Sequence, residues 1–178
     1  MKKTLMKDIK KDKGKIIKDL RKNSKETIDV MARRNGRSRQ TIWRMIKDLE
    51  KKIIWGYTIV FSRELLDLKH FIITMDFNTK PLSEKFRLEK IQRTISEELE
   101  KQMKNISLAC FYFAHGPHDI FIEISAKGIK DAVNARNFIC REIGDCIKDI
   151  TVSEILFNLV ENGIRNPEIK KFKDFYRG

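Results

Sequence analysis

Long apolar runs, cysteines, prolines and glycines are all scarce in this chain of 178 residues. No apolar run approaches the roughly 18 to 20 residues that span a bilayer, and the lysine-rich start is not followed by the apolar segment of a secretory signal. The three cysteines are an odd number, widely spaced among apolar residues, which suits buried thiols better than disulfides or a metal site. We therefore expect a soluble protein of the cytoplasm, without a membrane partner, whose thiols are Cys110, Cys140 and Cys146.

Acidic residues are scarce only in the first third of the chain. Residues 1 to 63 hold 20 Lys and Arg against 7 Asp and Glu, whereas residues 64 to 178 hold 18 of each. The whole net charge of +13 therefore lies in the first third. A basic module joined to a neutral one makes polyanion binding the first functional hypothesis.

The basic part has the pattern of a helix-turn-helix domain over residues 1–60. Apolar spacing predicts a first helix over residues 12–22, and Ser24 is a candidate N-cap for the second helix. That helix should end at Gly36, which can take a left-handed conformation, and Ser38 should cap the third. Three short helices, the last two joined by a tight glycine turn, are typical of this DNA-binding unit.

Beyond the third helix the pattern changes to strands. The stretch "IIWGYTIVF" favours a strand, as in a winged-type unit, and residues 61–69 form a connector. Residues 70–158 then show the order strand, helix, strand, strand, helix, strand, which predicts a ferredoxin-like βαββαβ domain of the α+β class with one sheet face left free for dimerisation. In the tail, 159–178, Asn166 and Pro167 suggest the start of a short helix.

The third helix separates two kinds of side chain on opposite faces. At 100° per residue, one face is apolar and can pack against the other two helices. The opposite face is basic and polar, and such faces are usually only solvated. Its position in the basic third of the chain favours DNA instead. The apolar face holds Ile42, Met45, Ile46, Leu49 and Ile53, and the polar face holds Arg39, Gln40, Trp43, Arg44, Lys47 and Lys51.

These faces suggest separate roles in DNA binding. Arginine and glutamine have the bidentate geometry for guanine and adenine edges, and recognition helices read bases with their N-terminal residues. Phosphate contacts fix position without reading sequence, and basic residues around the turn suit them. We assign base reading to Arg39, Gln40, Trp43 and Arg44, although Trp43 could equally pack on a neighbouring element, and phosphate contacts to Arg33, Arg34, Arg37 and Lys47.

Local signatures in this order resemble the Lrp/AsnC family of bacterial and archaeal transcription regulators. They are the capped helix "S...I......LE" from Ser38 to Glu50, the "II.GY" from Ile53 to Tyr57, and the "G..D" from Gly116 to Asp119. The resemblance spans about residues 12 to 159, so the tail is extra. It implies a homodimer or higher oligomer, with the strand near "GYTIVF" paired to its counterpart in a second subunit. It also implies an amino-acid effector near Gly116, His118 and Asp119.

Other functions remain to be weighed. His115, His118 and Asp119 could suggest a metal, but no third and fourth zinc ligand is indicated, and Gly116 and Pro117 are explained by a hairpin turn in which Asp119 bonds backbone amides. We expect no cofactor. The serious rival to a specific regulator is an architectural protein that coats DNA with little sequence preference. A tetrapyrrole-pathway decarboxylase shares the architecture, but its motifs have no convincing counterpart, so we expect no enzyme.

Overall fold

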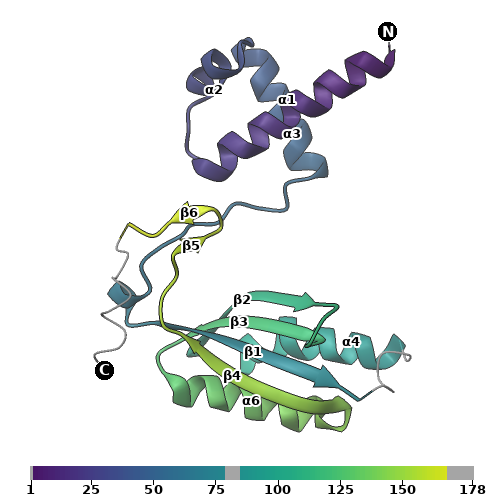
Figure 1. The fold of residues 1–178 in the computed structure, drawn as a ribbon, viewed down its shortest axis with the longest axis vertical. Helices are drawn as coiled ribbons and strands as arrows, with labels where there is room; N and C mark the ends of the chain where they lie inside the picture. Colours follow the sequence, from purple (N-terminus) through teal and green to yellow (C-terminus); the bar gives the residue numbers. More distant parts are fainter. Residues whose placement is uncertain (1, 79–84, 168–178) are drawn as a thin grey trace. The chain divides into compact units, whose positions relative to one another are not determined.

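The computed structural model describes residues 2–78 and 85–167, which divide into two compact units. Unit 1 is discontinuous and comprises Met1–Phe61 and Asn158–Gly178, and unit 2 comprises Ser62–Phe157. Unit 2 is thus inserted into unit 1 along the chain. Figure 1 shows the helices of unit 1 and the sheet of unit 2.

Unit 1 contains three helices packed around one small core. The helices are α1 (Lys2–Lys22), α2 (Ile28–Asn35) and α3 (Arg39–Lys52). Each helix contributes apolar residues at helical spacing, which is what the sequence pattern predicts for amphipathic helices. The core consists of Ile16, Leu20, Met31, Ala32, Ile42, Ile46 and Leu49.

Three sequence predictions about these helices need correction. The first helix begins at Lys2 rather than near residue 12. The second helix is capped by Thr27, whose Oγ1 accepts a hydrogen bond from the Val30 amide at 3.4 Å, and not by Ser24, which lies in the preceding turn. Ile53 follows the last turn of α3 and is 54% exposed, so the apolar face ends at Leu49.

The strand expected over "IIWGYTIVF" is not formed. Residues 54–61 contain no regular secondary structure. A short hairpin instead comes from the other end of the chain, with β5 (Val160–Glu161) and β6 (Ile164–Arg165) joined by Asn162 and Gly163. Both turn residues have positive φ, 50° and 83°, which is the requirement of a type I′ turn. The short helix expected to begin near Asn166 and Pro167 would lie outside the described residues.

Unit 2 is a four-stranded antiparallel sheet with helices. Its strands are β1 (Lys69–Phe77), β2 (Ile106–Phe113), β3 (Ile120–Ala126) and β4 (Ile147–Ile155), in the order β2-β3-β1-β4. The helices are α4 (Lys85–Arg93), a π-helical turn (Thr94–Glu98), α5 (Leu99–Gln102) and α6 (Ile129–Ile143), with short 3-10 turns at Glu64–Leu66 and Gly144–Cys146. This confirms the predicted ferredoxin-like fold.

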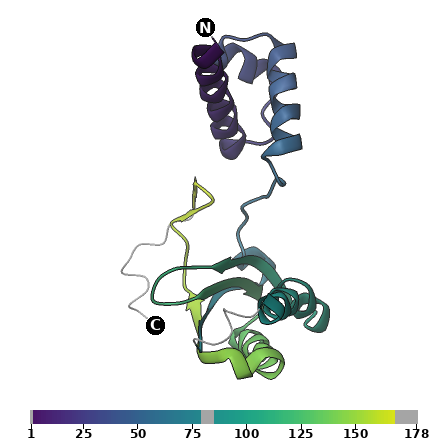
Figure 2. The same cartoon turned by 90° about the vertical axis from the view of Figure 1, so that its right-hand side faces the viewer.

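The helices of unit 2 all cover one face of the sheet, as the two views together show (Figures 1 and 2). Alternate residues of β1 and β3 are buried against them, among them Phe71, Ile73, Ile122 and Ile124. The other strand positions, such as Ile72 and Thr74 on β1, point to the uncovered face. The sheet therefore has one apolar face, which the helices cover, and one uncovered face with both apolar and polar side chains.

No helix within the described residues is long and apolar enough to cross a membrane.

Candidate nucleic-acid interface

The turn between α2 and α3 is built from three residues, Gly36, Arg37 and Ser38. Gly36 has φ 60° and ψ 39°, the left-handed conformation that ends a helix, and the Arg37 amide donates to the Ala32 carbonyl at 3.1 Å. Ser38 then caps α3, since its Oγ accepts a hydrogen bond from the Thr41 amide at 3.2 Å. The sequence predicted both features, and together they set the direction in which α3 leaves the turn.

The two faces of α3 are separated as the helical pattern predicts. Ile42 and Leu49 are fully buried and Ile46 is nearly so. The opposite side of the helix is exposed, and even Trp43 keeps half of its surface accessible. Trp43 therefore does not serve as a core residue of unit 1. The exposed side carries Arg39, Gln40, Trp43, Arg44, Lys47 and Lys51.

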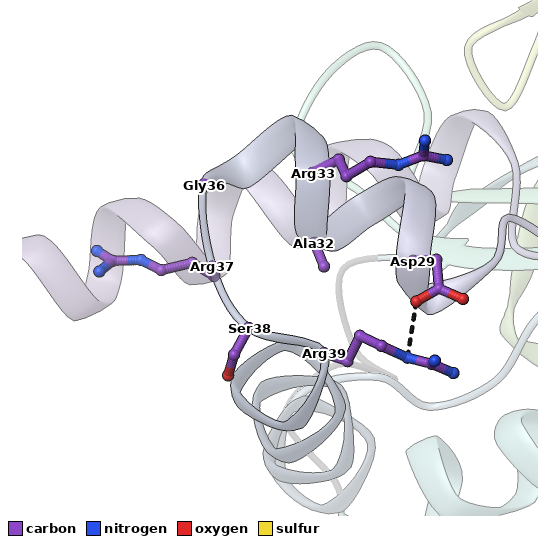
Figure 3. A pocket seen from close by; sticks show the side chains of 7 residues that line it. All are labelled: Asp29, Ala32, Arg33, Gly36, Arg37, Ser38 and Arg39. Carbon is purple, nitrogen blue, oxygen red and sulfur yellow. Dashed lines mark ion pairs between the residues drawn. The ribbon is translucent and has the colours of Figure 1, made fainter.

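An open hollow at the turn brings several of the predicted residues together. It is lined by Asp29, Ala32, Arg33, Gly36, Arg37, Ser38 and Arg39. Figure 3 shows Arg33 and Arg39 extending to one side of this hollow and Arg37 to the other, with Arg39 linked to Asp29. The Arg39 Nε lies 2.7 Å from the Asp29 Oδ1. The turn thus presents guanidinium groups to more than one side.

Four of the predicted DNA-binding residues are engaged in ion pairs within unit 1. Arg34 is the most constrained, because its two terminal nitrogens bind both oxygens of Glu26 at 2.8 and 2.5 Å, and Nη1 also lies 3.0 Å from Asp19. These two carboxylates raise the pKa of Arg34 above its ordinary value. The other three pairs are Arg37 with Asp12 at 2.6 Å, Arg39 with Asp29, and Lys47 with Glu50 at 2.8 Å.

Arg34 in turn affects the pKa of Asp19, one of the two carboxylates that it binds. Burial by itself would raise the pKa of Asp19, but hydrogen bonds from Asn35 and Arg34 outweigh it and lower that pKa. Asp19 and Glu26 retain only 12% and 14% of their side-chain exposure. Arg34 therefore holds α1, the loop before α2 and the end of α2 together, which the sequence pattern could not distinguish from a phosphate contact.

Arg33 and Arg44 differ from the other basic residues of the predicted set. Both are exposed, and no ion pair or hydrogen bond between described residues is recorded for either side chain. Gln40 is exposed as well. Of the predicted set, these side chains have the greatest freedom to turn toward a partner.

Two carboxylates near the end of α3, Asp48 and Glu50, form ion pairs with lysines. Hydrogen bonds from Lys13 and Lys52 lower the pKa of Asp48 to about 2. Hydrogen bonds from Lys47 and from the Tyr57 hydroxyl likewise lower the pKa of Glu50. Tyr57 thereby connects the chain after α3 back to the helix, at an Oη–Oε1 distance of 3.1 Å.

The predicted effector residues lie together in the loop between β2 and β3. Asp119 accepts a hydrogen bond from the Phe77 amide at 2.8 Å, and its own amide donates to the Met75 carbonyl at 3.0 Å. His118 Nδ1 lies 2.9 Å from Asp76 Oδ1. Asp119 thus ties this loop to the end of β1, in agreement with the expected backbone role. Among the described residues, no group of three or more His, Cys, Asp or Glu side chains is arranged to hold a metal ion.

Comparison with solved structures identifies the architecture. A regulator of the AsnC family from Agrobacterium tumefaciens superimposes with a TM-score of 0.64, at 15% identity, over 84% of this chain and 92% of the other. The fold is that of Lrp/AsnC regulators. The transcriptional regulator NMB0573 from Neisseria meningitidis, solved as a complex with L-Met, gives a TM-score of 0.66 at 17% identity over 85% and 92% of the two chains.

The likeness extends along more than nine-tenths of each compared chain. A protein named PH0061 matches with a TM-score of 0.63 at 21% identity, over 90% of this chain and 94% of the other. No family model matches the chain, and no curated protein matches its sequence. The shared feature is thus the fold, at identities too low to transfer a function.

Proposed function

We propose that this protein is a sequence-specific DNA-binding transcription regulator. The observation that carries the proposal is the exposed polar face of α3, directly after a glycine turn and a serine cap, in the unit that holds the net positive charge. A helix that buries one face and presents arginine, glutamine and an indole on the other has the shape and chemistry for the major groove.

The ion pairs of unit 1 refine the roles within this proposal. Gln40, Trp43 and Arg44 are the base-reading residues, and Arg39 joins them once it leaves Asp29. Arg33, Arg37 and Lys47 contact phosphates, since exposed ion pairs are weak, about 0 to 1 kcal/mol, and a phosphate can replace the carboxylate. Arg34 contributes by holding the unit together, and Ser38 by capping α3.

A homodimer is part of the proposal. The uncovered sheet face carries Ile72, Phe121 and the half-exposed Tyr112 beside polar residues. After α3, every second residue from Trp55 to Phe61 is a large aromatic or aliphatic side chain, and all four are exposed, which is the alternation of a strand with one apolar face. A second copy would cover both surfaces. The four residues are Trp55, Tyr57, Ile59 and Phe61.

The last part of the proposal is that an amino-acid effector binds near Gly116, His118 and Asp119. Its support is the L-Met complex of the Neisseria protein and the placement of these residues in one loop. Because Asp119 binds the backbone of β1, a ligand held through that loop could act on the sheet directly.

A genome-wide footprint of the full-length protein tests the function. The expected result is a palindromic consensus with half-sites about 10 base pairs apart or a multiple of this, as a symmetric helix-turn-helix dimer requires. Uniform coverage of the genome would instead establish the architectural role. A visible absorption band on the purified protein would point to a bound tetrapyrrole and to the enzyme.

A further inference from the structure

The outer face of α1 is a second basic surface of unit 1, separate from α3. We define this outer face by Lys15, Lys18, Arg21 and Lys22, which are all exposed. α1 has 21 residues, a length of about 30 Å at 1.5 Å per residue. Among its residues from Asp12 onward, whose side chains the structure describes, Ile16, Ile17 and Leu20 contribute to the core. The exposed lysines and arginine of this stretch lie outside that core.

Asp12 and Asp19 of α1 form ion pairs on its inner side. Asp12 pairs with Arg37 and Asp19 with Arg34, while Lys13, also on this side, pairs with Asp48 of α3. At 100° per residue these three positions and the buried Ile16 fall within about 120° of one another. The inner side is therefore neutralised by α2, α3 and the turn.

The outer face has no such compensation. No ion pair between described residues is recorded for Lys15, Lys18 or Arg21, and Lys22 lies only near enough to Asp19 to help lower its pKa. The helix repeat places positions 3, 7, 10 and 11 on the same side, and all four are lysine. Residues 2 to 11 hold five lysines against one aspartate. The sequence of α1 thus has an excess of lysine before Lys15 as well.

We propose that the outer face of α1 binds the phosphate backbone of a second DNA duplex. A duplex carries one negative charge per about 1.7 Å of its axis, so a straight row of lysines three or four residues apart, about 4.5 to 6 Å, meets phosphates along its length. The inference rests on the proposed function, in which α3 holds the first duplex. Because the inner side of α1 contacts α3, a duplex seated on α3 does not run along the outer face.

Bridging of two duplexes by the full-length protein tests this inference. Donor-labelled duplex carrying the cognate site and acceptor-labelled random duplex are mixed with protein, and energy transfer reports bridging. The test variant carries Lys15→Gln, Lys18→Gln and Lys22→Gln. Its matched control removes the same charge from exposed lysines of unit 2, with the substitutions Lys127→Gln, Lys130→Gln and Lys148→Gln.

The expected result separates the two surfaces. The test variant binds the cognate duplex within about twofold of the wild type but loses energy transfer, while the control keeps both. As single substitutions are added, the slope of log affinity for the random duplex against log salt should fall by about 0.9 for each lysine that contacts a phosphate. Unchanged thermal unfolding of the variants excludes loss of folding.

Three outcomes have different meanings. If Arg44→Ala abolishes bridging and the test variant retains it, bridging comes from two copies of α3 in a dimer, and the inference is overturned. Binding of acidic phospholipid vesicles through these lysines, without capture of random duplex, also overturns it. If the wild type shows no preference for any sequence but bridging still depends on these lysines, the proposed function fails and the outer-face inference stands.

Discussion

Substitution of Arg44 by alanine tests the proposed base-reading role of α3. Arg44 is exposed near the start of the helix, and no ion pair between described residues is recorded for it. A bidentate contact to guanine contributes about 1 to 3 kcal/mol of discrimination. At 1.4 kcal/mol per factor of ten, the variant should bind its cognate site about 5- to 150-fold more weakly.

The same substitution should leave folding and random-sequence binding nearly unchanged. Alanine is the better helix former, and no recorded contact within the described residues is lost. Affinity for cognate and random duplexes is measured by fluorescence anisotropy at one fixed salt concentration, alongside thermal unfolding. Equal losses on the two duplexes would refute the assignment of Arg44 to bases.

Two arginines serve as comparisons for this experiment. Arg33→Ala should weaken both duplexes equally, because a phosphate contact carries no sequence information. Arg34→Ala should instead lower the unfolding temperature first, since it leaves Glu26 and Asp19, both largely buried, without their cation. An Arg34 variant with wild-type stability but reduced binding would return that residue to the DNA-contacting set.

Three further predictions concern side chains that stabilise the folds of the two units. Thr27→Ala should cost about 1 kcal/mol of unfolding free energy through loss of the cap, whereas Ser24→Ala should cost almost nothing, as denaturant unfolding will measure. The lowered pKa of Asp48, about 2, means that its ion pairs stabilise the fold above the ordinary pKa of 3.8 and lose this effect as pH falls toward 2. Asp48→Asn should therefore flatten the loss of stability in that interval, and an unchanged acid profile would contradict it. Asp119→Ala should destabilise unit 2 by about 1 to 3 kcal/mol because the Phe77 amide loses its acceptor, and Asp119→Asn, which keeps an oxygen, should recover part of this.

Local patterns were sufficient to predict most of the fold. Apolar spacing, Gly36 and Ser38 predicted the helices of unit 1, and the alternation of strands and helices predicted the ferredoxin-like sheet. The N-cap was wrong because Ser24 and Thr27 are both good caps, and sequence alone does not show where the chain turns into α2. The hairpin at residues 160–165 was missed although its Asn-Gly pair is a strong hairpin signal.

The sequence predicted which side chains of α3 are exposed, but not which carboxylate pairs with each basic residue. The exposed set follows from helical periodicity, which is a local property. The pairing of Arg34 with Glu26 and Asp19 depends on how three helices pack, and no local pattern contains it. The strand expected over residues 54–61 fails for a similar reason, because a strand needs a neighbour that this single chain does not supply there.

Because unit 2 is inserted into unit 1, it could be exchanged for a domain from another protein. The chain enters the sheet on β1 and leaves it on β4, and His70 at the entry is paired directly with Ile155 at the exit. Paired residues of adjacent antiparallel strands have Cα atoms only about 4.5 to 5.5 Å apart. An inserted unit whose two ends meet so closely can be replaced by another domain with the same spacing, so grafts at this junction should yield chimeras in which unit 1 keeps its fold.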